Sequence, residues 1–302
     1  MKSDRPKMLQ PLGGRPMLTH LLDTVQALAP GGVHVVIGAG AEAVQAACDG
    51  YRVNWVHQEE RLGTGHAVMQ ALPAVPDGAP VLVLLGDAPL IPGTLLAEMV
   101  ESYRGPLALL TMELEDPHGY GRILRDPGGN IIGVVEHGDA EPHQHAIREV
   151  NTGIIMADSE KLRAWLGRIG NDNAKGEYYL PDVFPLARAL DGEIQGVRAE
   201  HAEDLAGAND RGQLAALERR YQRAWATACR GYGARGCGIG AWRPARGCCP
   251  TACWKAYGPR APATSAPSPA YGRAPSCPRA AGSAISSKPR TRGWVRTARP
   301  AT

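Results

Sequence analysis

Two hydrophobic periodicities alternate over residues 17–114, and this alternation restricts the possible folds of the chain more than any other feature. Apolar residues spaced three and four apart, or short segments of helix-forming residues, predict helices at 17–28, 41–48, 65–72 and 92–103. Apolar runs predict strands at 33–38, 53–57, 81–87 and 107–114. Strands separated by helices usually pair in parallel through right-handed crossovers. The sequence therefore predicts an α/β fold, doubly wound around a mostly parallel sheet.

After residue 114 the pattern changes to longer strands joined by a tight turn. Residues 120–125 and 130–136 flank a Pro127-Gly-Gly129 turn, which predicts a hairpin, and residues 150–156 predict a further strand. Such an antiparallel insertion commonly forms the second wall of a substrate cleft. Glu136 and Asn151, at the edges of these strands, are then expected to face the ligand.

Charge is divided unevenly along the chain, whose formal net charge is +3. All 30 acidic residues lie before Arg219, whereas 16 of the 33 Lys and Arg residues lie from Arg219 onward. The two parts therefore need separate interpretations. No apolar run is long enough to span a bilayer and no signal peptide is visible, so we expect a soluble cytoplasmic protein with no membrane or nucleic-acid partner.

The second part, residues 226–302, contains six of the seven cysteines within Ala, Arg, Pro, Gly and Ser. It has few aliphatic residues and no periodicity, which predicts a disordered tail behind a folded domain at 1–225. The cysteines lack paired C-x2-C spacing, so a zinc site is disfavoured. Two interpretations stay open: a basic linker, or a segment translated out of frame.

Asp87 and a glycine-rich turn form the first candidate site. Asp87 follows the apolar run of residues 81–86, and Leu62-Gly-Thr-Gly-His-Ala67 opens the preceding helix. A carboxylate at the carboxyl end of a buried strand can offer oxygen to a metal, and a glycine turn lets the backbone approach a bound group. The pairing predicts a nucleotide site, although Asp87 could instead cap the helix that begins near Pro92.

A longer ordered series of motifs resembles a known family. The series is Pro6-Lys7, Gln58, Leu62-Gly-Thr-Gly-His-Ala67, Leu85-Gly-Asp-Ala-Pro-Leu90, Gly119-Tyr-Gly-Arg-Ile123, Val135-Glu-His137, Glu149-Val-Asn-Thr-Gly-Ile154, Gly176-Glu-Tyr-Tyr-Leu180 and Asn209. It resembles the uridylyltransferase domain of the bacterial bifunctional N-acetylglucosamine-1-phosphate uridylyltransferase/glucosamine-1-phosphate acetyltransferase (GlmU). The resemblance covers roughly residues 1–225 and implies a Rossmann-like nucleotide-diphospho-sugar transferase fold.

The resemblance implies a reaction and a metal. UTP and N-acetylglucosamine 1-phosphate would give UDP-N-acetylglucosamine, a precursor of peptidoglycan and lipopolysaccharide, and pyrophosphate. Asp87 and Asn209 match the family's Mg²⁺ ligands, in keeping with the preference of Mg²⁺ for oxygen. Lys7 matches a lysine that contacts phosphate.

The roles expected for the remaining site residues also come from the resemblance. Gln58, Gly63 and Thr64 match the positions that contact uracil, while Gly121, Glu136 and Asn151 match those that contact the N-acetylglucosamine moiety. Leu85 and Gly86 match positions beside the substrate, and the family often has Tyr at the position of Leu85.

Two departures from the family shape our expectations. The family opens with a strand and a phosphate loop of the form L-A-A-G-x-G-T-R-M, and the given sequence starts after it at Met1. No hexapeptide repeats of the family's trimeric β-helix follow Ala226, so we expect neither acetyltransferase activity nor a trimer.

Simpler roles remain open for several of these residues. Asn209 could be the N-cap of the helix running toward Tyr221, Glu136 could be a solvated hairpin end, and Lys7 could be an unspecific terminal lysine. His137, His143 and His145 suggest a loop cluster more than a metal site. At the level of function, a different sugar-phosphate nucleotidyltransferase and a non-catalytic remnant that binds sugar nucleotide are the alternatives.

Overall fold

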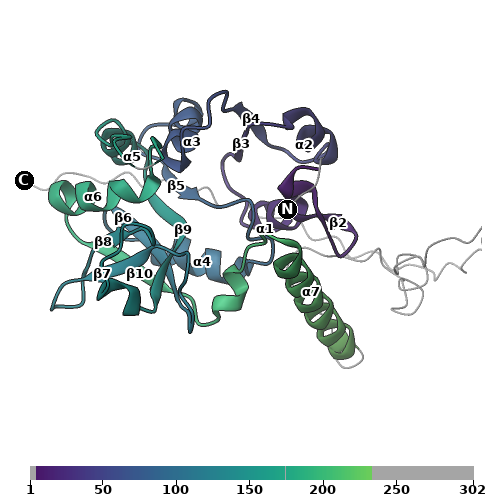
Figure 1. Cartoon of the computed structure of the whole chain (residues 1–302). Coiled ribbons are helices and arrows are strands. Elements are labelled where there is room, and N and C mark those ends of the chain that lie inside the picture. The colour runs from purple at the N-terminus through teal and green to yellow at the C-terminus, as the bar shows by residue number, and fades with distance from the viewer. Residues whose placement is uncertain (1–4, 174, 233–302) are drawn as a thin grey trace, which may run out of the picture. The chain divides into compact units, whose positions relative to one another are not determined.

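A computed structural model of the chain describes residues 5–173 and 175–232, with side chains to residue 227 (Figure 1). Most of the tail expected at 226–302 lies outside these residues, together with five of its six cysteines. The α-helices are α1 (Met17–Ala27), α2 (Ala41–Ala47), α3 (Thr64–Ala71), α4 (Gly93–Ser102), α5 (Ser159–Leu166), α6 (Val183–Asp191) and α7 (Arg211–Tyr232). The 3-10 helices are η1 (Lys7–Leu9), η2 (Leu72–Ala74), η3 (Gln144–Ala146), η4 (Leu180–Asp182) and η5 (Ala202–Leu205). Within the described ranges, no helix is both long and apolar enough to cross a bilayer.

The strands form one large sheet and two small ones. The large sheet has the order β5 (Pro80–Val83), β9 (Glu149–Asp158), β6 (Leu107–Glu113), β10 (Ile194–Arg198), β8 (Ile131–Val135) and β7 (Arg122–Arg125). The small sheets pair β1 (Pro11–Leu12) with β2 (Arg15–Pro16), and β3 (His34–Ile37) with β4 (Asn54–His57). The α/β class, the four helices expected before residue 114 and the hairpin at β7 and β8 are confirmed.

The large sheet has mixed pairing, because β9 lies between β5 and β6 and runs antiparallel to both. β10 pairs with β6 in parallel, so β5, β6 and β10 share one direction. β7 and β8 add antiparallel pairs at the far edge. The large sheet is therefore not mostly parallel, contrary to expectation. β5 and β6 do share one direction, but β9 of the insertion separates them, and β6 with β10 is the one parallel pair among its described strands.

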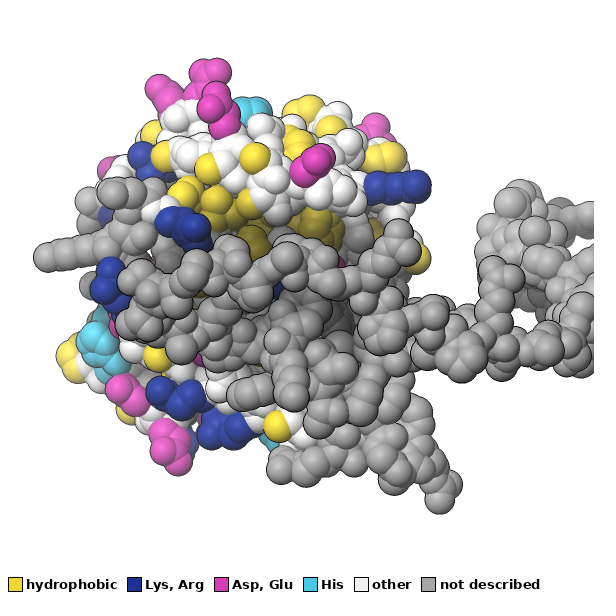
Figure 2. Space-filling model, turned by 90° about the vertical axis from the view of Figure 1, so that its right-hand side faces the viewer, with side chains coloured by type: hydrophobic (Ala, Val, Ile, Leu, Met, Phe, Trp, Pro, Cys, Tyr) yellow, Lys and Arg dark blue, Asp and Glu magenta, His cyan; other side chains and the backbone are white. Residues whose placement is uncertain are grey.

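The expected single sheet is divided: β3 and β4 pair only with each other among the described strands. No described strand lies between β3 and β5 to join them. Their hydrophobic side chains belong to a cluster with α1 and α2, distinct from the clusters on the large sheet. Figure 2 shows hydrophobic side chains gathered in the upper part of the face that it presents, at the height of α2, β3 and β4 in Figure 1.

The central strands of the large sheet are apolar on both faces. Leu107 and Leu109 of β6 pack with Trp165 of α5 and Phe184 of α6, whereas Leu110 faces a second cluster with α1 and α4. Burial on both faces explains why β6 is a continuous apolar run rather than an alternating one. The expected helices α1 and α4 therefore cover one face of this sheet, whereas α5 and α6, which were not expected, cover the other.

Asp87 does not end a strand, contrary to expectation. β5 stops at Val83, which is opposite Ile155 of β9, and Asp87 lies in a turn four residues later. Beyond this pair, Gly153 of β9 has a φ of +75°, and a Cβ there would lie 2.7 Å from Leu85 Cδ1. The segment carrying Asp87 therefore leaves the sheet before the site begins.

The C-terminal helix α7 continues through the boundary expected at residue 225 and reaches Tyr232. Its first turns pack on the N-terminal segment, with Leu217 beside Leu12 and Met17 (Figure 1). Gly13 N donates a hydrogen bond to Glu218 Oε2 at 2.7 Å. These contacts join the two ends of the described domain near Lys7 and Asn209.

Candidate active site

Three residues far apart in sequence meet at one point. Lys7 Nζ lies 2.6 Å from Asp87 Oδ2 and 2.5 Å from Asn209 Oδ1. The side chains of Lys7 and Asp87 are 31% and 27% exposed, so the contact is open to solvent on one side. An ammonium group thus lies between a carboxylate oxygen and an amide oxygen.

The local backbone explains why these oxygens converge. A Cβ on Gly86 would lie 3.0 Å from Met8 Sδ, and one on Gly207 would lie 3.2 Å from the backbone oxygen of Asp87. These close approaches bring the Asp87 turn against both the Lys7 segment and the segment before α7. Only residues without a Cβ permit such approaches without a shift of the neighbour.

The capping roles that the sequence left open are taken by other residues. Pro92 is the N-cap of α4 and makes no side-chain capping bond, so Asp87 does not cap that helix. Asp210 Oδ1 accepts a hydrogen bond from Gln213 N at 2.8 Å, which makes Asp210 the side-chain cap of α7. The side chain of Asn209 is thereby directed to Lys7 instead.

The three candidate uracil contacts lie together beside the start of α3. Gln58 Nε2 donates to the backbone oxygen of Gly63 at 3.2 Å and lies 3.0 Å from His66 Nδ1. Thr64 Oγ1 accepts a hydrogen bond from Leu180 N at 3.1 Å. His66 therefore helps to orient Gln58.

Gly63 has a backbone conformation that requires glycine. Its φ is +104° and its ψ is 178°, a combination that is essentially restricted to glycine. A Cβ would lie 2.6 Å from Tyr178 O. The turn is held against the segment that follows residue 174 by hydrogen bonds from Gly65 N to Tyr178 O and from Tyr178 N to Leu62 O.

The candidate sugar contacts form a second group, on the hairpin and β9. A Cβ on Gly121 would lie 3.2 Å from Glu136 Oε1, and Asn151 N donates to Gly121 O at 2.9 Å. Asn151 Oδ1 accepts a hydrogen bond from Gly153 N at 2.9 Å. Gly121 is thus in contact with both Glu136 and Asn151.

Glu136 is half-buried, not the solvated hairpin end that the sequence left open. Burial raises the pKa of its carboxyl group, the cation of Lys175 opposes this shift, and the carboxylates of Asp139 and Asp182 add to it. Burial also raises the pKa of Asp182, with Asp139 contributing. A partly desolvated carboxyl group is suited to accept hydrogen bonds from hydroxyl groups.

Two features link the three groups into one site. The segment of residues 175–182 contacts the Gly63 turn on one side and provides Lys175 and Asp182 beside Glu136 on the other. Tyr120 interacts electrostatically with Asp87: burial raises the pKa of the Tyr120 phenol, and the Asp87 carboxylate raises it further. The hairpin therefore faces the turn that carries Asp87.

The donor set at Asp87 and Asn209 fits a hard divalent cation. Both oxygens already surround one cation, the ammonium group of Lys7. Mg²⁺ is bound by one or two carboxylate or carbonyl oxygens together with waters and substrate phosphates, rather than by a cage of protein ligands. Asp87 and Asn209 would hold such an ion.

The histidines expected to cluster do so only in part. The ring of His137 makes edge-to-face contacts with His118 and His145, at centroid separations of 4.4 and 5.0 Å respectively. His143 contacts Glu141 instead. Within the described ranges, no group of three or more His, Cys, Asp or Glu side chains is arranged to hold a metal ion. The histidine cluster therefore packs against itself.

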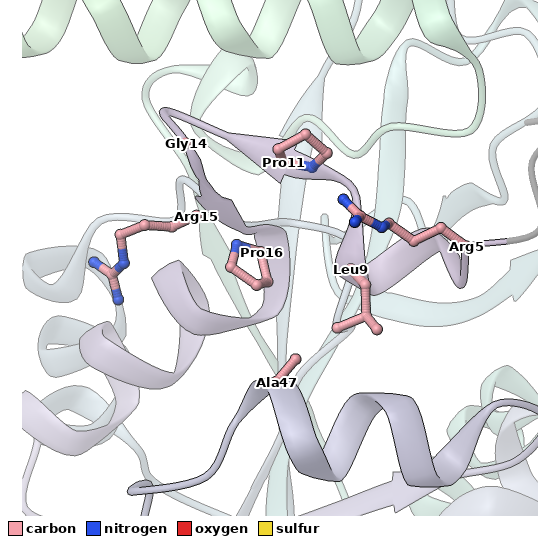
Figure 3. Close-up of a pocket in the computed structure, with 7 residues that line it drawn as sticks. All are labelled: Arg5, Leu9, Pro11, Gly14, Arg15, Pro16 and Ala47. Carbon is pink, nitrogen blue, oxygen red and sulfur yellow. The ribbon is translucent and has the colours of Figure 1, made fainter. Parts of the chain in front are cut away.

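A separate concave region lies near the N-terminal strands and has a volume of about 280 Å³ (Figure 3). It is lined by Arg5, Leu9, Pro11, Gly14, Arg15, Pro16 and Ala47. Figure 3 shows Arg15 pointing away from the other lining residues, which agrees with its ion pair to Asp23 at 2.8 Å. The two arginines do not converge, and none of the candidate site residues lines this region.

Comparison with known proteins identifies the fold family. The family model described as a MobA-like NTP transferase domain matches residues 1–171. The chain belongs to this family. The matched range contains Lys7 and Asp87, whereas Asn209 lies beyond it.

Curated relatives show which members of this family the chain resembles. The chain is 52% identical over 224 residues to the bifunctional protein GlmU of Alkalilimnicola ehrlichii, and 50% identical over 223 residues to that of Xanthomonas oryzae. These matches cover 74% of the chain but only 48% and 49% of the relatives, so the chain spans about half their length. Within the NTP transferases, the described part is thus similar to the GlmU uridylyltransferase domain.

A solved structure supports the fold alone. HddC from Yersinia pseudotuberculosis, complexed with GMP-PN, aligns with a TM-score of 0.54 over 73% of this chain and 92% of its own. Its sequence identity is 15%. The likeness agrees with the nucleotidyltransferase architecture of the described residues.

Three residues of the candidate site were not predicted from the sequence. Tyr120 lies near Asp87, and Lys175 and Asp182 lie near Glu136. Tyr120 is within a motif used to recognise the family, so its position was available as a signal. No local pattern marks Lys175 or Asp182, because their place beside Glu136 depends on how residues 175–182 pack.

Proposed function

We propose that the chain transfers a uridylyl group from UTP to N-acetylglucosamine 1-phosphate, forming UDP-N-acetylglucosamine. A phosphate oxygen of the sugar phosphate attacks the α-phosphorus of UTP in line. A new oxygen–phosphorus bond forms as the bond to the β-phosphate breaks, and pyrophosphate leaves. The reaction needs no covalent nucleophile, so catalysis depends on positioning and charge stabilisation.

The meeting of Lys7, Asp87 and Asn209 carries this proposal. A bound Mg²⁺ would neutralise charge on the triphosphate and the leaving pyrophosphate. Asp87 and Asn209 offer the ion two oxygens, and Lys7 provides a flexible cation within reach of the same point.

Selectivity for uracil is supported by Gln58 and the Gly63 turn. An amide side chain and exposed backbone can match the alternating donor and acceptor edge of uracil. Gln58 is held by His66, and Gly63 brings the backbone close without a side chain. An ordered amide loses little conformational freedom on binding, which favours discrimination between bases.

Recognition of the sugar is supported by Glu136, Asn151 and Gly121. The half-buried Glu136 carboxyl group can accept hydrogen bonds from sugar hydroxyls, and Asn151 has an amide nitrogen for an N-acetyl oxygen or a phosphate. Gly121 has no side chain, so the Glu136 carboxyl group can lie close to the backbone of the hairpin.

The direct experiment measures pyrophosphate release by the full chain with UTP, N-acetylglucosamine 1-phosphate and Mg²⁺. We expect release that depends on Mg²⁺ and that Asp87→Ala reduces by at least about 100-fold, because the triphosphate charge loses its counter-ion. Asp49→Asn, an exposed acid just after α2, is the control and should leave the rate unchanged. Undiminished release by Asp87→Ala would remove Asp87 from the site.

Substrate panels distinguish the alternatives. Preference for GTP or CTP over UTP would indicate a different sugar-phosphate nucleotidyltransferase. Absence of turnover, together with a melting temperature that UDP-N-acetylglucosamine raises, would indicate a binding protein without catalysis. Either result would contradict the proposal.

A further inference from the structure

The ammonium group of Lys7 occupies the position between the two oxygens that would bind the metal. It lies within hydrogen-bonding distance of both Asp87 Oδ2 and Asn209 Oδ1. Both acceptors come from distant segments, at 80 and 202 residues from Lys7 in sequence. The site therefore contains an internal cation.

The ammonium group and a divalent ion exclude each other at this point. Mg²⁺ binds oxygen at about 2.0–2.1 Å, so an ion on Asp87 and Asn209 would take the volume that Lys7 Nζ fills. Two cations so close also repel each other strongly. Lys7 must leave both oxygens when the ion binds.

Lys7 is able to leave. It is the first residue of η1, a single turn of 3-10 helix, and its side chain is 31% exposed. A lysine has four rotatable side-chain bonds and three donors on a compact ammonium group, so it can reorient without moving its backbone. An ion pair this exposed is weak enough to be exchanged.

We propose that Lys7 is an exchangeable counter-ion that holds Asp87 and Asn209 together without metal and is displaced when Mg²⁺ and the nucleotide bind. The released ammonium group then lies beside the metal-bound phosphates, where it contacts an oxygen of the triphosphate. The exchange keeps the two ligand oxygens at one point in the absence of metal, and it makes metal binding weaker without nucleotide than with it. This inference rests on the proposed function, because it assigns the metal to Asp87 and Asn209.

Titration of the full chain with Mn²⁺ in the absence of nucleotide, followed by the electron paramagnetic resonance of free Mn²⁺, tests the exchange. Lys7→Met removes the competing cation and keeps the length of the side chain. We expect its Mn²⁺ dissociation constant to fall by about fivefold, because the metal no longer has to displace an ammonium group from Asp87 and Asn209. Lys7→Arg keeps the charge and should bind as weakly as the unmodified chain.

Two further variants make the test specific. Lys175→Met removes a similar charge beside Glu136 and should change the constant by less than about twofold, because an exposed charge away from the ligands is screened. Adding Asp87→Asn to Lys7→Met should abolish the gain in Mn²⁺ affinity, because the carboxylate ligand is then lost. Lys7→Gln provides a second neutral variant, to be used where Lys7→Met does not fold.

Unchanged or weaker Mn²⁺ binding by both neutral variants would overturn the proposal. An equal gain in Lys175→Met would overturn it as well, because the effect would then be general charge removal. The proposed function is tested separately: the expected order of Mn²⁺ affinities without uridylyl transfer would leave the exchange standing, whereas transfer without that order would reject the exchange alone.

Discussion

Single residues fix the contacts between the loops of this site, and Gly63 is the clearest example. Its positive φ and its distance from Tyr178 O leave no space for a side chain. Gly78 also has a positive φ, +67°, yet a Cβ there would meet no atom within 4 Å. Gly63 therefore combines severe backbone strain with steric overlap, whereas Gly78 has only a positive φ.

We predict that Gly63→Ala lowers the free energy of unfolding by about 3 kcal/mol, because strain and overpacking add. Gly78→Ala should cost only about 1 kcal/mol, the price of a left-handed alanine. Urea unfolding of both variants measures the difference. Equal losses would show that the Gly63 turn can move away from Tyr178.

Lys7, Asp87 and Asn209 show what residue identity can and cannot indicate. Asp87 stood out from the sequence through its apolar run and neighbouring glycines, and the ordered motifs included Lys7 and Asn209. Their meeting at one point follows only from the packing of η1, the Asp87 turn and the start of α7. The sequence left open that Lys7 is an unspecific terminal lysine, yet it contacts both others.

At the scale of elements, a bidentate ion pair between Arg125 and Glu149 connects β7 to β9. Arg125 Nε and Nη2 donate to the two oxygens of Glu149 at 2.8 and 2.7 Å, and Thr111 Oγ1 donates at 2.8 Å. The Arg125 hydrogen bonds lower the pKa of Glu149, burial opposes the shift, and the Thr111 bond adds to it. The hairpin that carries Gly121 and Glu136 is therefore joined to the strand that carries Asn151.

A pH dependence follows from the direction of this shift. The folded-state pKa lies below the ordinary value of 4.5, so the stabilisation is complete above that value and is lost as the pH falls through the lower folded-state pKa. We predict that Glu149→Gln costs about 1 kcal/mol at neutral pH, a value limited by the solvent exposure of Arg125.

Urea unfolding of the chain and of Glu149→Gln across a pH series checks this prediction, and the difference between them should shrink below about pH 4. Glu98→Gln, on the exposed face of α4, is the matched control. A difference that stays constant with pH would assign the effect to packing rather than to the charge of Glu149.

Across the whole described domain, the strands differ in how extensively they are paired and buried. β6 is paired on both sides, by β9 and β10, and its residues from Leu107 to Leu110 are fully buried. β3 and β4 form a two-stranded sheet, and their residues are mostly half-buried. Two-stranded sheets have little independent stability in water, so this region depends on α1, α2 and α3.

We predict that the amide hydrogens of β3 and β4 exchange with solvent at least about tenfold faster than those of β6, because local opening costs less there. Hydrogen exchange followed by mass spectrometry on the full chain measures both regions at once. Equal protection would mean that the two sheets unfold as one cooperative unit.

The sequence by itself determined the α/β class, the order of helices and strands, the hairpin and the candidate residues, because these depend on local periodicity and on short motifs. Tertiary structure alone decided that β9 lies between β5 and β6, that β5 ends four residues before Asp87, and that β3 and β4 form their own sheet. Strand order and strand ends depend on which distant edges are available for pairing, and no local pattern encodes that. The contact of Lys7 with Asp87 and Asn209 has the same cause, since it brings together residues that are 80 and 202 positions apart.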